Sequence, residues 1–349
     1  MFKNAYQGKR VLVTGHTGFK GSWLVSWLKI LGSDVAGYSV GVPTQPSHFE
    51  LLDLTHRIED YRGDIRDRKA LAAAIDEFQP QIIFHLAAQP IVRLSYDDPY
   101  DTFDVNVMGI VNLLDIIRNR SFVEVAVLIT SDKAYRNVEW PWGYRETDAL
   151  GGHDPYSSSK GCAELVAFSF FHSFLKRTNL RVATTRAGNV IGGGDWAADR
   201  IIPDAVRAWS AQKAVTIRSP KATRPWQHVL EPLSGYLWLG AHLMMNTPNL
   251  NGEAYNFGPN ADVTESVEQL LELMARNWTD AKWQVPDSAG GGAHEAHLLK
   301  LSCDKALLQL RWKPVLNFTE TVQMTASWYL NWLAQKTAIA DFTDRQIQD

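Results

Sequence analysis

The chain has 349 residues, of which 45% are hydrophobic and 21% are charged, and its formal net charge at pH 7 is −3. This length allows one large domain, or two closely joined ones, with ample buried core. The slightly negative charge argues against a general affinity for nucleic acid, so no nucleic-acid partner is expected.

Cysteine content and apolar runs bear on where the protein works. Cys162 and Cys303 are too few for a disulfide framework and lack the spacing of a metal site, so no metal centre is expected. The N-terminal residues 1–7 contain no apolar signal core, and no apolar run is long enough to span a bilayer. We therefore expect a cytoplasmic protein with no membrane partner.

A strand, a glycine-rich turn and a helix follow one another at the start of the chain. Residues 10–14 form an apolar run typical of a buried parallel strand, and apolar side chains then recur at helical spacing up to Gly32. The heptapeptide between them, GHTGFKG, has the spacing GxxGxxG and predicts a turn that approaches a pyrophosphate at a helix N-terminus. The residues expected to contact a dinucleotide here are Gly15, Thr17, Gly18, Phe19, Lys20 and Gly21.

The next two strands leave the identity of the dinucleotide open. The second strand, over 35–39, ends in Ser39, where an Asp or Glu usually binds the ribose of NAD. No arginine follows it closely in the chain to favour the 2′-phosphate of NADP. The third strand ends at Ile65, and Asp64 is placed to meet the adenine, unless it is an ordinary turn carboxylate.

Strands and helices continue to alternate up to residue 188. The fourth strand, over 81–86, runs into Ala87-Ala88-Gln89, whose small side chains leave room for a ligand. Long helices are expected over 99–119 and from 155 to about 178, with strands over 125–130 and 182–186. This alternation predicts a Rossmann-like α/β fold with a doubly wound parallel sheet.

After Asn189 the pattern changes. We expect a flexible loop over 191–196, a helix beginning near Arg200, and helices near 264–276, 304–310 and 318–335. The strand over 255–257 returns to the edge of the sheet. We therefore expect a cofactor-binding domain over 1–188 with returning segments near 228–258. A smaller, mostly helical substrate-binding lobe takes 189–227 and 259–335, and 336–349 form a frayed tail.

Tyr156 and Lys160 lie four positions apart, on one face of the predicted helix. An unperturbed tyrosine has a pKa near ~10, and a nearby ammonium lowers that pKa. Tyr156 could then take a proton from a substrate hydroxyl, as hydride transfer requires. Tyr and Lys also occur at this spacing on solvated helix faces, so the upstream nucleotide-binding turn is what favours the catalytic interpretation.

Ser131, Asp132 and Lys133 follow the fifth strand and should meet Tyr156 at the carboxyl edge of the sheet. An alcohol dehydrogenase or an epimerase needs the hydroxyl, the tyrosine and Lys160, but has no obvious need of Asp132 and Lys133. An adjacent acid and base suit elimination of water, where one protonates the leaving hydroxyl and the other removes a carbon-bound proton. The alternative is a surface ion pair at a strand end.

Six motifs carry a resemblance that extends to about residue 330. They are TGHTGFKGSW (14–23), AAQP (87–90), TSDK (130–133), WGYRE (142–146), DPYSSSK (154–160) and RPWQHV (224–229). With them the chain resembles the extended short-chain dehydrogenase/reductase family of nucleotide-sugar enzymes, and within it the 4,6-dehydratases. Related dehydratases of dTDP- and GDP-sugars carry Glu where Lys133 stands, and commonly Thr where Ser131 stands.

The resemblance implies NAD that stays bound while a nucleotide sugar, CDP-glucose, loses water. Tyr156 would take the 4-hydroxyl proton, Ser131 would hold the 4-oxygen, and Asp132 would protonate the departing 6-hydroxyl. Lys160 would lower the pKa of Tyr156 and bond the nicotinamide ribose. The resemblance adds Ile65, Ala87, Ala88, Gln89, Asn106 and Thr130 to the cofactor site, and Arg93, Asn189, Arg200, Arg218 and Arg224 as substrate-binding residues.

The resemblance also implies a homodimer formed by the helices at 99–119 and 155–178, with a tetramer left open. Three alternatives remain at this point. The chain could be a nucleotide-sugar 4-epimerase, a dehydratase of a dTDP-, GDP- or UDP-hexose, or a non-catalytic NAD-binding regulator.

Overall fold

A seven-stranded parallel sheet forms the centre of the computed structural model, which describes residues 1–217, 219–260, 263–285 and 298–349. The strand order is β11-β6-β5-β4-β1-β2-β3, so the winding of the chain reverses between β1 and β4. The strands are β1 (Arg10–Thr14), β2 (Asp34–Ser39), β3 (Glu59–Arg62), β4 (Ile82–His85), β5 (Val125–Ile129), β6 (Arg181–Ala187) and β11 (Ala254–Phe257). As the sequence predicts, the segment around 255–257 returns as an edge strand, β11, parallel to β6.

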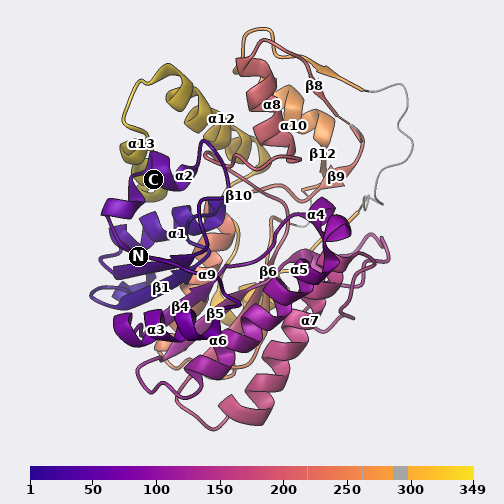
Figure 1. Cartoon of the computed structure of the whole chain (residues 1–349). Helices are drawn as coiled ribbons and strands as arrows, with labels where there is room; N and C mark the ends of the chain where they lie inside the picture. The colour runs from indigo at the N-terminus through magenta and orange to yellow at the C-terminus, as the bar shows by residue number, and fades with distance from the viewer. Residues whose placement is uncertain (218, 261–262, 286–297) are drawn as a thin grey trace.

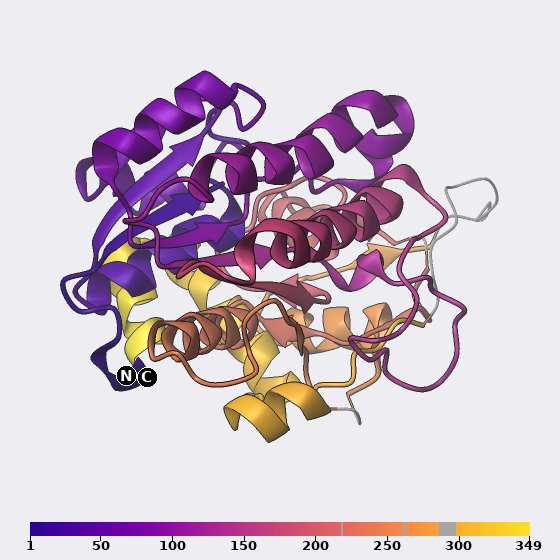
Figure 2. The same ribbon diagram turned by 90° about the horizontal axis from the view of Figure 1, so that it is seen from below.

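Helices cover both faces of the sheet, because alternate side chains of each strand point to opposite sides. Val11 and Val13 of β1 belong to one apolar core, with α1 (Phe19–Ile30) and α9 (Leu230–Met244). Leu12 belongs to the other. That second core is covered by α3 (Arg68–Phe78), α6 (Gly109–Ile117) and α7 (Pro155–Phe170). Figure 2 shows the sheet between these two helical layers.

Each of the two long predicted helices contains a π-helical stretch. The first consists of α5 (Pro99–Phe103), the π-helix η3 (Asp104–Met108) and α6. The second consists of α7 followed by the π-helix η5 (Phe171–Leu175). Such wide turns are rare and are frequent at functional sites. Asn106, in η3, is 2% exposed, so this wide turn holds a buried polar side chain.

A smaller C-terminal lobe lies on the side of the sheet where α4 (Val92–Asp97) follows the carboxyl end of β4 (Figure 1). Its helices are α8 (Ile201–Ser210), α10 (Val267–Ala275) and α12 (Phe318–Ala334). Its short strand pairs are β7 (Val190–Ile191) with β10 (Gln227–His228), β8 (Val215–Thr216) with β13 (Trp283–Gln284), and β9 (Thr223–Arg224) with β12 (Glu265–Ser266). The remaining elements are η1 (Phe2–Asn4), α2 (His48–Leu51), η2 (Leu54–His56), η4 (Asp132–Ala134), α11 (Asp304–Leu310) and α13 (Ile339–Gln348).

The C-terminal tail differs from the expectation. Instead of fraying, residues 339–348 form α13, which lies against α12 and α1. Thr343 accepts a hydrogen bond from Trp328 Nε1 at 2.9 Å, and Ile347 is 4% exposed. The charged residues of this tail occupy the outer face of an amphipathic helix, and a composition-based expectation could not see that periodicity in so short a segment.

The loop over 191–196 also differs from the expectation, because it is buried rather than loosely held. Trp23 Nε1 donates a hydrogen bond to the carbonyl oxygen of Gly193 at 2.9 Å. A Cβ atom at Gly193 would lie 1.9 Å from the Trp328 ring, so only glycine fits there. Three glycines in a row suggest flexibility from sequence, but here they allow close packing. No helix in the described parts of the chain has the length and apolar character needed to cross a membrane.

Candidate active site

The glycine turn passes very close to the carboxyl end of β4. Gly15 has a φ of +74°, and a Cβ atom there would lie 2.7 Å from the backbone nitrogen of Ala87. A Cβ atom at Gly21 would lie 2.2 Å from the carbonyl oxygen of Gly15. Among the described residues, none caps the start of α1, at Gly18, with its side chain. The first turn of α1 therefore presents its backbone N–H groups to an anion, as a pyrophosphate site requires.

Three residues of the turn, Thr17, Phe19 and Lys20, each contact or are influenced by a different part of the chain. The hydroxyl of Thr17 donates to the carbonyl oxygen of Gly41 at 2.6 Å, which ties the turn to the segment after β2. Phe19 contacts the loop that contains Gly192. Lys20 is influenced by Arg200, Asp132 and Asp195, and burial is the main reason that its pKa is lowered to about 8.

The end of β2 carries a polar network that the sequence did not reveal. The sheet register places Arg62 of β3 beside Ser39, so an arginine does stand next to this position. Arg62 donates to Asp60 at 2.6 and 3.2 Å, and the other oxygen of Asp60 lies 2.9 Å from His16 Nε2. Ser39 Oγ lies 3.1 Å from His16 Nδ1. The carboxylate of this network therefore comes from β3, at Asp60, rather than from β2.

The third strand is expected from the sequence to end at Ile65, but β3 ends at Arg62, so Asp64 and Ile65 follow it and lie beside the α5–α6 segment. The carboxylate of Asp64 accepts hydrogen bonds from the Arg66 backbone and guanidinium, at 2.6 to 3.1 Å. This contact holds the pKa of Asp64 below its ordinary value. Ile65 is buried against Gly109 of α6. Asp64 is therefore an ionised side chain held in one orientation at the expected adenine position.

Ala87, Ala88 and Gln89 form the loop after β4, and Asn106 holds this loop in place. Asn106 Oδ1 accepts from the Gln89 backbone at 2.9 Å, and its Nδ2 donates to Gln89 O at 3.2 Å. The same amide donates to Ser159 of α7 at 2.9 Å. Asn106 therefore joins the crevice loop to the helix that carries Tyr156.

Ser131 and Asp132 lie together at the end of β5. Ser131 Oγ donates to Asp132 Oδ1 at 2.9 Å and accepts from the Lys133 backbone at 3.2 Å. Asp132 is 4% exposed, and its Oδ2 is buried without a protein partner among the described residues. Burial raises the pKa of Asp132, against the opposing charge of Lys133. The result is a carboxyl group suited to hold a proton.

Tyr156 and Lys160 are both buried in the first turns of α7, at 8% and 5% exposure. Lys160 Nζ lies 5.9 Å from the centroid of the Tyr156 ring. Burial raises the pKa of Tyr156 to about 12, although a hydrogen bond with Ser131 opposes the rise. The rise is opposite to the lowering expected from Lys160, because desolvation disfavours the phenolate, and the cation that opposes the rise is Arg200. Burial also lowers the pKa of Lys160 to about 8.

A buried ion pair behind these groups was not predicted. Glu164 of α7 and Arg186 of β6 are 2.9 Å apart, with side-chain exposures of 4% and 3%. Glu164 also accepts from the hydroxyls of Thr130 and Thr184. The hydroxyl of Thr130, which we expected at the cofactor, is therefore directed toward Glu164. The spacing of Glu164 from Tyr156 and Lys160 on one helix face was the signal that could have found it.

Two of the predicted substrate-binding arginines pair with carboxylates around the C-terminal lobe. Arg200, which directly precedes α8, donates to Asp195 at 2.8 Å, and Asp195 is itself 4% exposed. Arg93 of α4 lies 3.6 Å from Asp199 and is 71% exposed. The Arg93–Asp199 pair connects α4 with the loop before α8, whereas Arg200 and Asp195 both belong to that loop. Asp195 was missed from sequence, because an isolated carboxylate in a glycine-rich segment carries no recognisable pattern.

The other predicted substrate-binding residues lie on neighbouring short strands or outside the described parts. Arg224, in β9, donates to the carbonyl oxygen of Thr223 at 2.8 Å. The backbone of Asn189 accepts from Gln227 at 3.1 Å, next to the β7–β10 pair. Arg218 lies outside the described residues. Within the described residues, no group of three or more potential metal ligands comes together.

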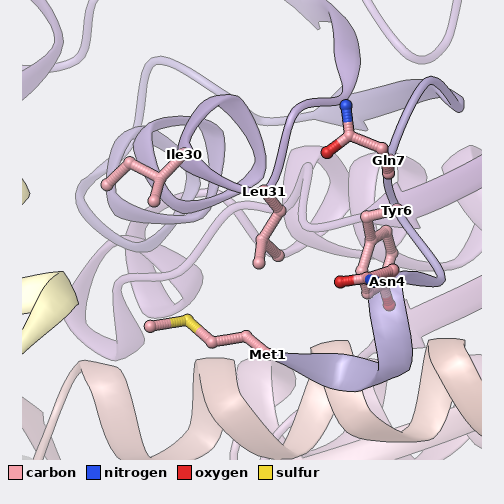
Figure 3. A pocket seen from close by; sticks show the side chains of 6 residues that line it. All are labelled: Met1, Asn4, Tyr6, Gln7, Ile30 and Leu31. Atoms are coloured by element: carbon pink, nitrogen blue, oxygen red, sulfur yellow. The ribbon is translucent and has the colours of Figure 1, made fainter.

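A separate hollow lies between the N-terminal residues and the C-terminal end of α1, and Figure 3 shows the side chains that line it. It is lined by Met1, Asn4, Tyr6, Gln7, Ile30 and Leu31. Ile30 and Leu31 mark the C-terminal end of α1, whereas the glycine turn precedes its N-terminal end. This hollow is therefore distant from the groups described above and takes no part in the candidate site.

Comparison with known proteins identifies a family that matches most of the chain. The family described as GDP-mannose 4,6 dehydratase matches residues 12–325. A CDP-glucose 4,6-dehydratase of Salmonella typhimurium is 49% identical over 337 residues, which cover 95% of this chain and 93% of that protein.

Two solved structures give the same fold. UDP-glucose 4-epimerase of Thermus thermophilus, in complex with NAD, has a TM-score of 0.75 at 25% identity and covers 92% of this chain and 99% of its own. dTDP-glucose 4,6-dehydratase of Bacillus anthracis, also with NAD, has a TM-score of 0.77 at 21% identity, with coverages of 93% and 97%. At such identity the second likeness shows the fold alone.

Proposed function

The chain belongs to the GDP-mannose 4,6 dehydratase family, and we propose that it converts CDP-glucose to CDP-4-keto-6-deoxyglucose in an NAD-dependent dehydration. The observation that carries this proposal is the buried Asp132 carboxyl, which lies beside Ser131 at the strand end nearest Tyr156. The 49% identity to a CDP-glucose 4,6-dehydratase supports the same substrate. The enzyme is a hydro-lyase, because the reaction eliminates water from the sugar and the hydride taken from C4 is returned to C6.

NAD fits the residues of the glycine turn. The close approach of Gly15 to Ala87 and the uncapped start of α1 form a cradle for a pyrophosphate. When bound there, NAD supplies reversible hydride acceptance, and its cationic ring favours a nearby phenolate. Asp60, on β3, neutralises Arg62, so this guanidinium does not offer its charge to a 2′-phosphate, and NAD is favoured over NADP.

The first chemical step is oxidation at C4 of the glucose. Tyr156 takes the proton of the 4-hydroxyl, and Ser131 holds the 4-oxygen by a hydrogen bond. Lys160, one turn further along α7, provides a cation that favours the phenolate form of Tyr156. Because both side chains are buried, water does not screen this charge, and the interaction is stronger than on a surface.

The second step is loss of water across C5 and C6. Asp132 protonates the departing 6-hydroxyl, a role that suits a carboxyl whose pKa is raised by burial. Lys133 removes the C5 proton, either directly or through a water molecule. The hydride then returns to C6 and the proton held by Lys133 returns to C5, which gives a 4-keto-6-deoxy sugar still attached to CDP.

The anionic diphosphate of the substrate is bound by arginines of the cleft. Arg200, Arg93 and Arg224, with Asn189, are the described candidates, and Arg218 joins them on sequence grounds. A guanidinium suits phosphate because its planar fork donates two parallel hydrogen bonds. Asp195 and Asp199 hold two of these arginines, and the diphosphate would take over that role.

Product mass is the decisive test of the proposed function. The purified protein is incubated in four parallel reactions, each with NAD and one nucleotide sugar. The four sugars are CDP-, dTDP-, GDP- and UDP-glucose. Loss of one water from CDP-glucose alone is the expected result. A 4-epimerase would leave the mass unchanged, and dehydration of another nucleotide sugar would reassign the substrate. No reaction with any of the four would leave a non-catalytic NAD-binding protein as the better interpretation.

We also propose a homodimer, formed by the outer faces of α5 and α7. These faces expose large apolar side chains, which isolated soluble proteins seldom gather in one place. They are Tyr100, Phe103, Met108, Leu165 and Phe168. A shallow apolar hollow on α5 and η3, next to Cys162, lies within the same surface. Light scattering measures the molar mass of the unaltered chain and of Phe168→Asp. A dimer that becomes a monomer in Phe168→Asp is expected, and a monomer in both would refute the proposed homodimer. A tetramer would require a further surface.

A further inference from the structure

Glu164 makes the most complete set of buried polar contacts around the candidate site. Its Oε1 accepts from the hydroxyl of Thr130, at the end of β5, at 2.5 Å and from Arg186 Nε at 2.9 Å. Its Oε2 accepts from the hydroxyl of Thr184 at 2.6 Å and from Arg186 Nη2 at 3.0 Å. Both carboxylate oxygens are thus bonded by neighbouring strands of the sheet.

The contacts of Arg186 extend this network to the loop after η4. Its Nη1 donates to the carbonyl oxygen of Glu146 at 3.3 Å, and its guanidinium lies 4.6 Å from the Tyr135 ring centroid. Burial opposes ionisation of Glu164, but Arg186 and the two threonine hydroxyls together bring the pKa of Glu164 below its ordinary value. The carboxylate is therefore charged and immobile.

The position of Glu164 along α7 relates this network to the reaction. It follows Lys160 by four residues and Tyr156 by eight, so all three side chains lie on one face of the helix. Thr130, its partner on β5, directly precedes Ser131. We propose that Glu164 is a positioning residue, which locks the helix bearing Tyr156 and Lys160 to the strand end bearing Ser131 and keeps a negative charge one turn from Lys160. This inference rests on the proposed function.

The charged and titratable groups around Lys160 make the contribution of Glu164 measurable. Burial and Lys20, from the start of α1, both lower the pKa of Lys160, whereas Glu164 raises it. His85 of β4 is neutral near pH 7, because burial lowers its pKa to about 3. Tyr156 is the remaining neighbour on the same helix face. Glu164 is thus the carboxylate that keeps Lys160 a cation near neutral pH.

The test compares variants that separate the negative charge of the Glu164 side chain from its length. Glu164→Gln keeps the shape and removes the charge, Glu164→Asp keeps the charge and shortens the reach, and Thr184→Val removes one hydrogen bond only. The basic limb of kcat/KM for CDP-glucose, where Lys160 loses its proton, is measured against pH in each. Since unit charges about 6 Å apart in an effective dielectric near ~20 shift a pKa by about one to two units, Glu164→Gln should move this limb down by about one unit.

A second readout does not depend on turnover. The Nζ resonance of Lys160 in ¹⁵N-lysine-labelled protein, assigned by its loss in Lys160→Met, should titrate at lower pH in Glu164→Gln. Glu164→Asp and Thr184→Val should leave both readouts near their original values, although kcat falls in Glu164→Asp. If the unaltered protein does not dehydrate CDP-glucose, the proposed function is rejected. The Nζ titration does not depend on turnover and still tests whether Glu164 raises the pKa of Lys160.

Two results would overturn the inference. One is an unchanged basic limb and an unchanged Nζ titration in folded Glu164→Gln, and the other is an equal shift in Thr184→Val. Glu164→Gln leaves the Arg186 charge buried without its partner, which is strongly destabilising. If that variant does not fold, the uncharged pair Glu164→Gln with Arg186→Met replaces it, and a smaller shift in the same direction is required, because a cation is removed together with the carboxylate.

Discussion

Ser131 Oγ lies 2.9 Å from Asp132 Oδ1, while Asp132 Oδ2 is buried without a partner among the described residues. One hydroxyl therefore orients the carboxyl group, and the other carboxyl oxygen makes no hydrogen bond within the described residues. A Cβ atom at Gly188 would lie 3.0 Å from this free oxygen, so a side chain there would crowd the same space. The arrangement fits an acid that delivers one proton to one leaving group.

Asp132→Asn should therefore separate oxidation from loss of water. The amide cannot protonate the 6-hydroxyl, but Tyr156 and Lys160 remain to oxidise C4. In a single turnover, the near-ultraviolet absorbance of the reduced cofactor should rise and persist, with no loss of water by mass. Dehydration at the normal rate in this variant would assign the acid elsewhere.

Lys133→Met should abolish solvent deuterium exchange at C5 of the sugar while C4 oxidation continues. The expected reason is that Lys133 removes the C5 proton, directly or through a water molecule. The alternative is that Lys133 only holds Asp132 in place. The backbone N–H of Lys133 donates to Ser131 Oγ, and the same hydroxyl donates to Asp132. Exchange at the original rate in Lys133→Met would establish that alternative.

Tyr156→Phe should fold normally and lose turnover by ~10²–10⁴-fold, which is the usual contribution of a positioned acid–base group. The aromatic ring remains and only the hydroxyl is lost. Because Tyr156 is only 8% exposed, the packing around its ring is preserved. Thermal unfolding and NAD binding serve as controls for the fold. Turnover close to normal would mean that another group takes the 4-hydroxyl proton.

Asp60→Asn should weaken the preference for NAD over NADP. The carboxylate now neutralises Arg62, which the sheet places beside Ser39. Without that charge, Arg62 can meet a 2′-phosphate, and the affinity for NADP should rise roughly tenfold relative to NAD, as expected for one hydrogen bond between charged groups. Calorimetry of both cofactors checks this, with Glu59→Gln on the same strand as the matched control. Equal or tighter NADP binding by the unaltered protein would contradict the assigned preference.

Acid should destabilise the fold through three buried histidines. Burial lowers the pKa of His48, His85 and His228 to about 3 each. Each is protonated near pH ~6.5 only when unfolded, so the stability that these neutral rings provide is complete above that pH and is lost as pH falls toward 3. Below about pH 6 the free energy of unfolding should drop by about 1.4 kcal/mol per pH unit for each histidine.

Urea unfolding at stepped pH values measures this slope. His48→Gln should reduce the slope by about 1.4 kcal/mol per pH unit, because the contribution of one histidine is removed. The substitution keeps a nitrogen or oxygen able to reach Ser22, whose Oγ lies 2.7 Å from His48 Nδ1. A slope that does not change in His48→Gln would show that other groups control the acid limit.

The local features of this protein are the ones that its sequence determined. The strand, glycine turn and helix at residues 10–30, and the placement of Tyr156 and Lys160 on one helix face, depend on residues within a few turns of each other. The alternation of strands and helices also determined the parallel sheet, because a crossover helix joins two parallel strands in one handedness. These predictions needed no long-range contact.

The tertiary structure decided which distant residues share a charge or a hydrogen bond. Arg62 reaches Ser39, and Glu164 reaches Arg186, only through the pairing of neighbouring strands and the packing of α7 on the sheet. It also decided that α13 packs rather than frays. Burial decided the pKa of Tyr156, since desolvation depends on everything that surrounds the phenol and not on the spacing to Lys160.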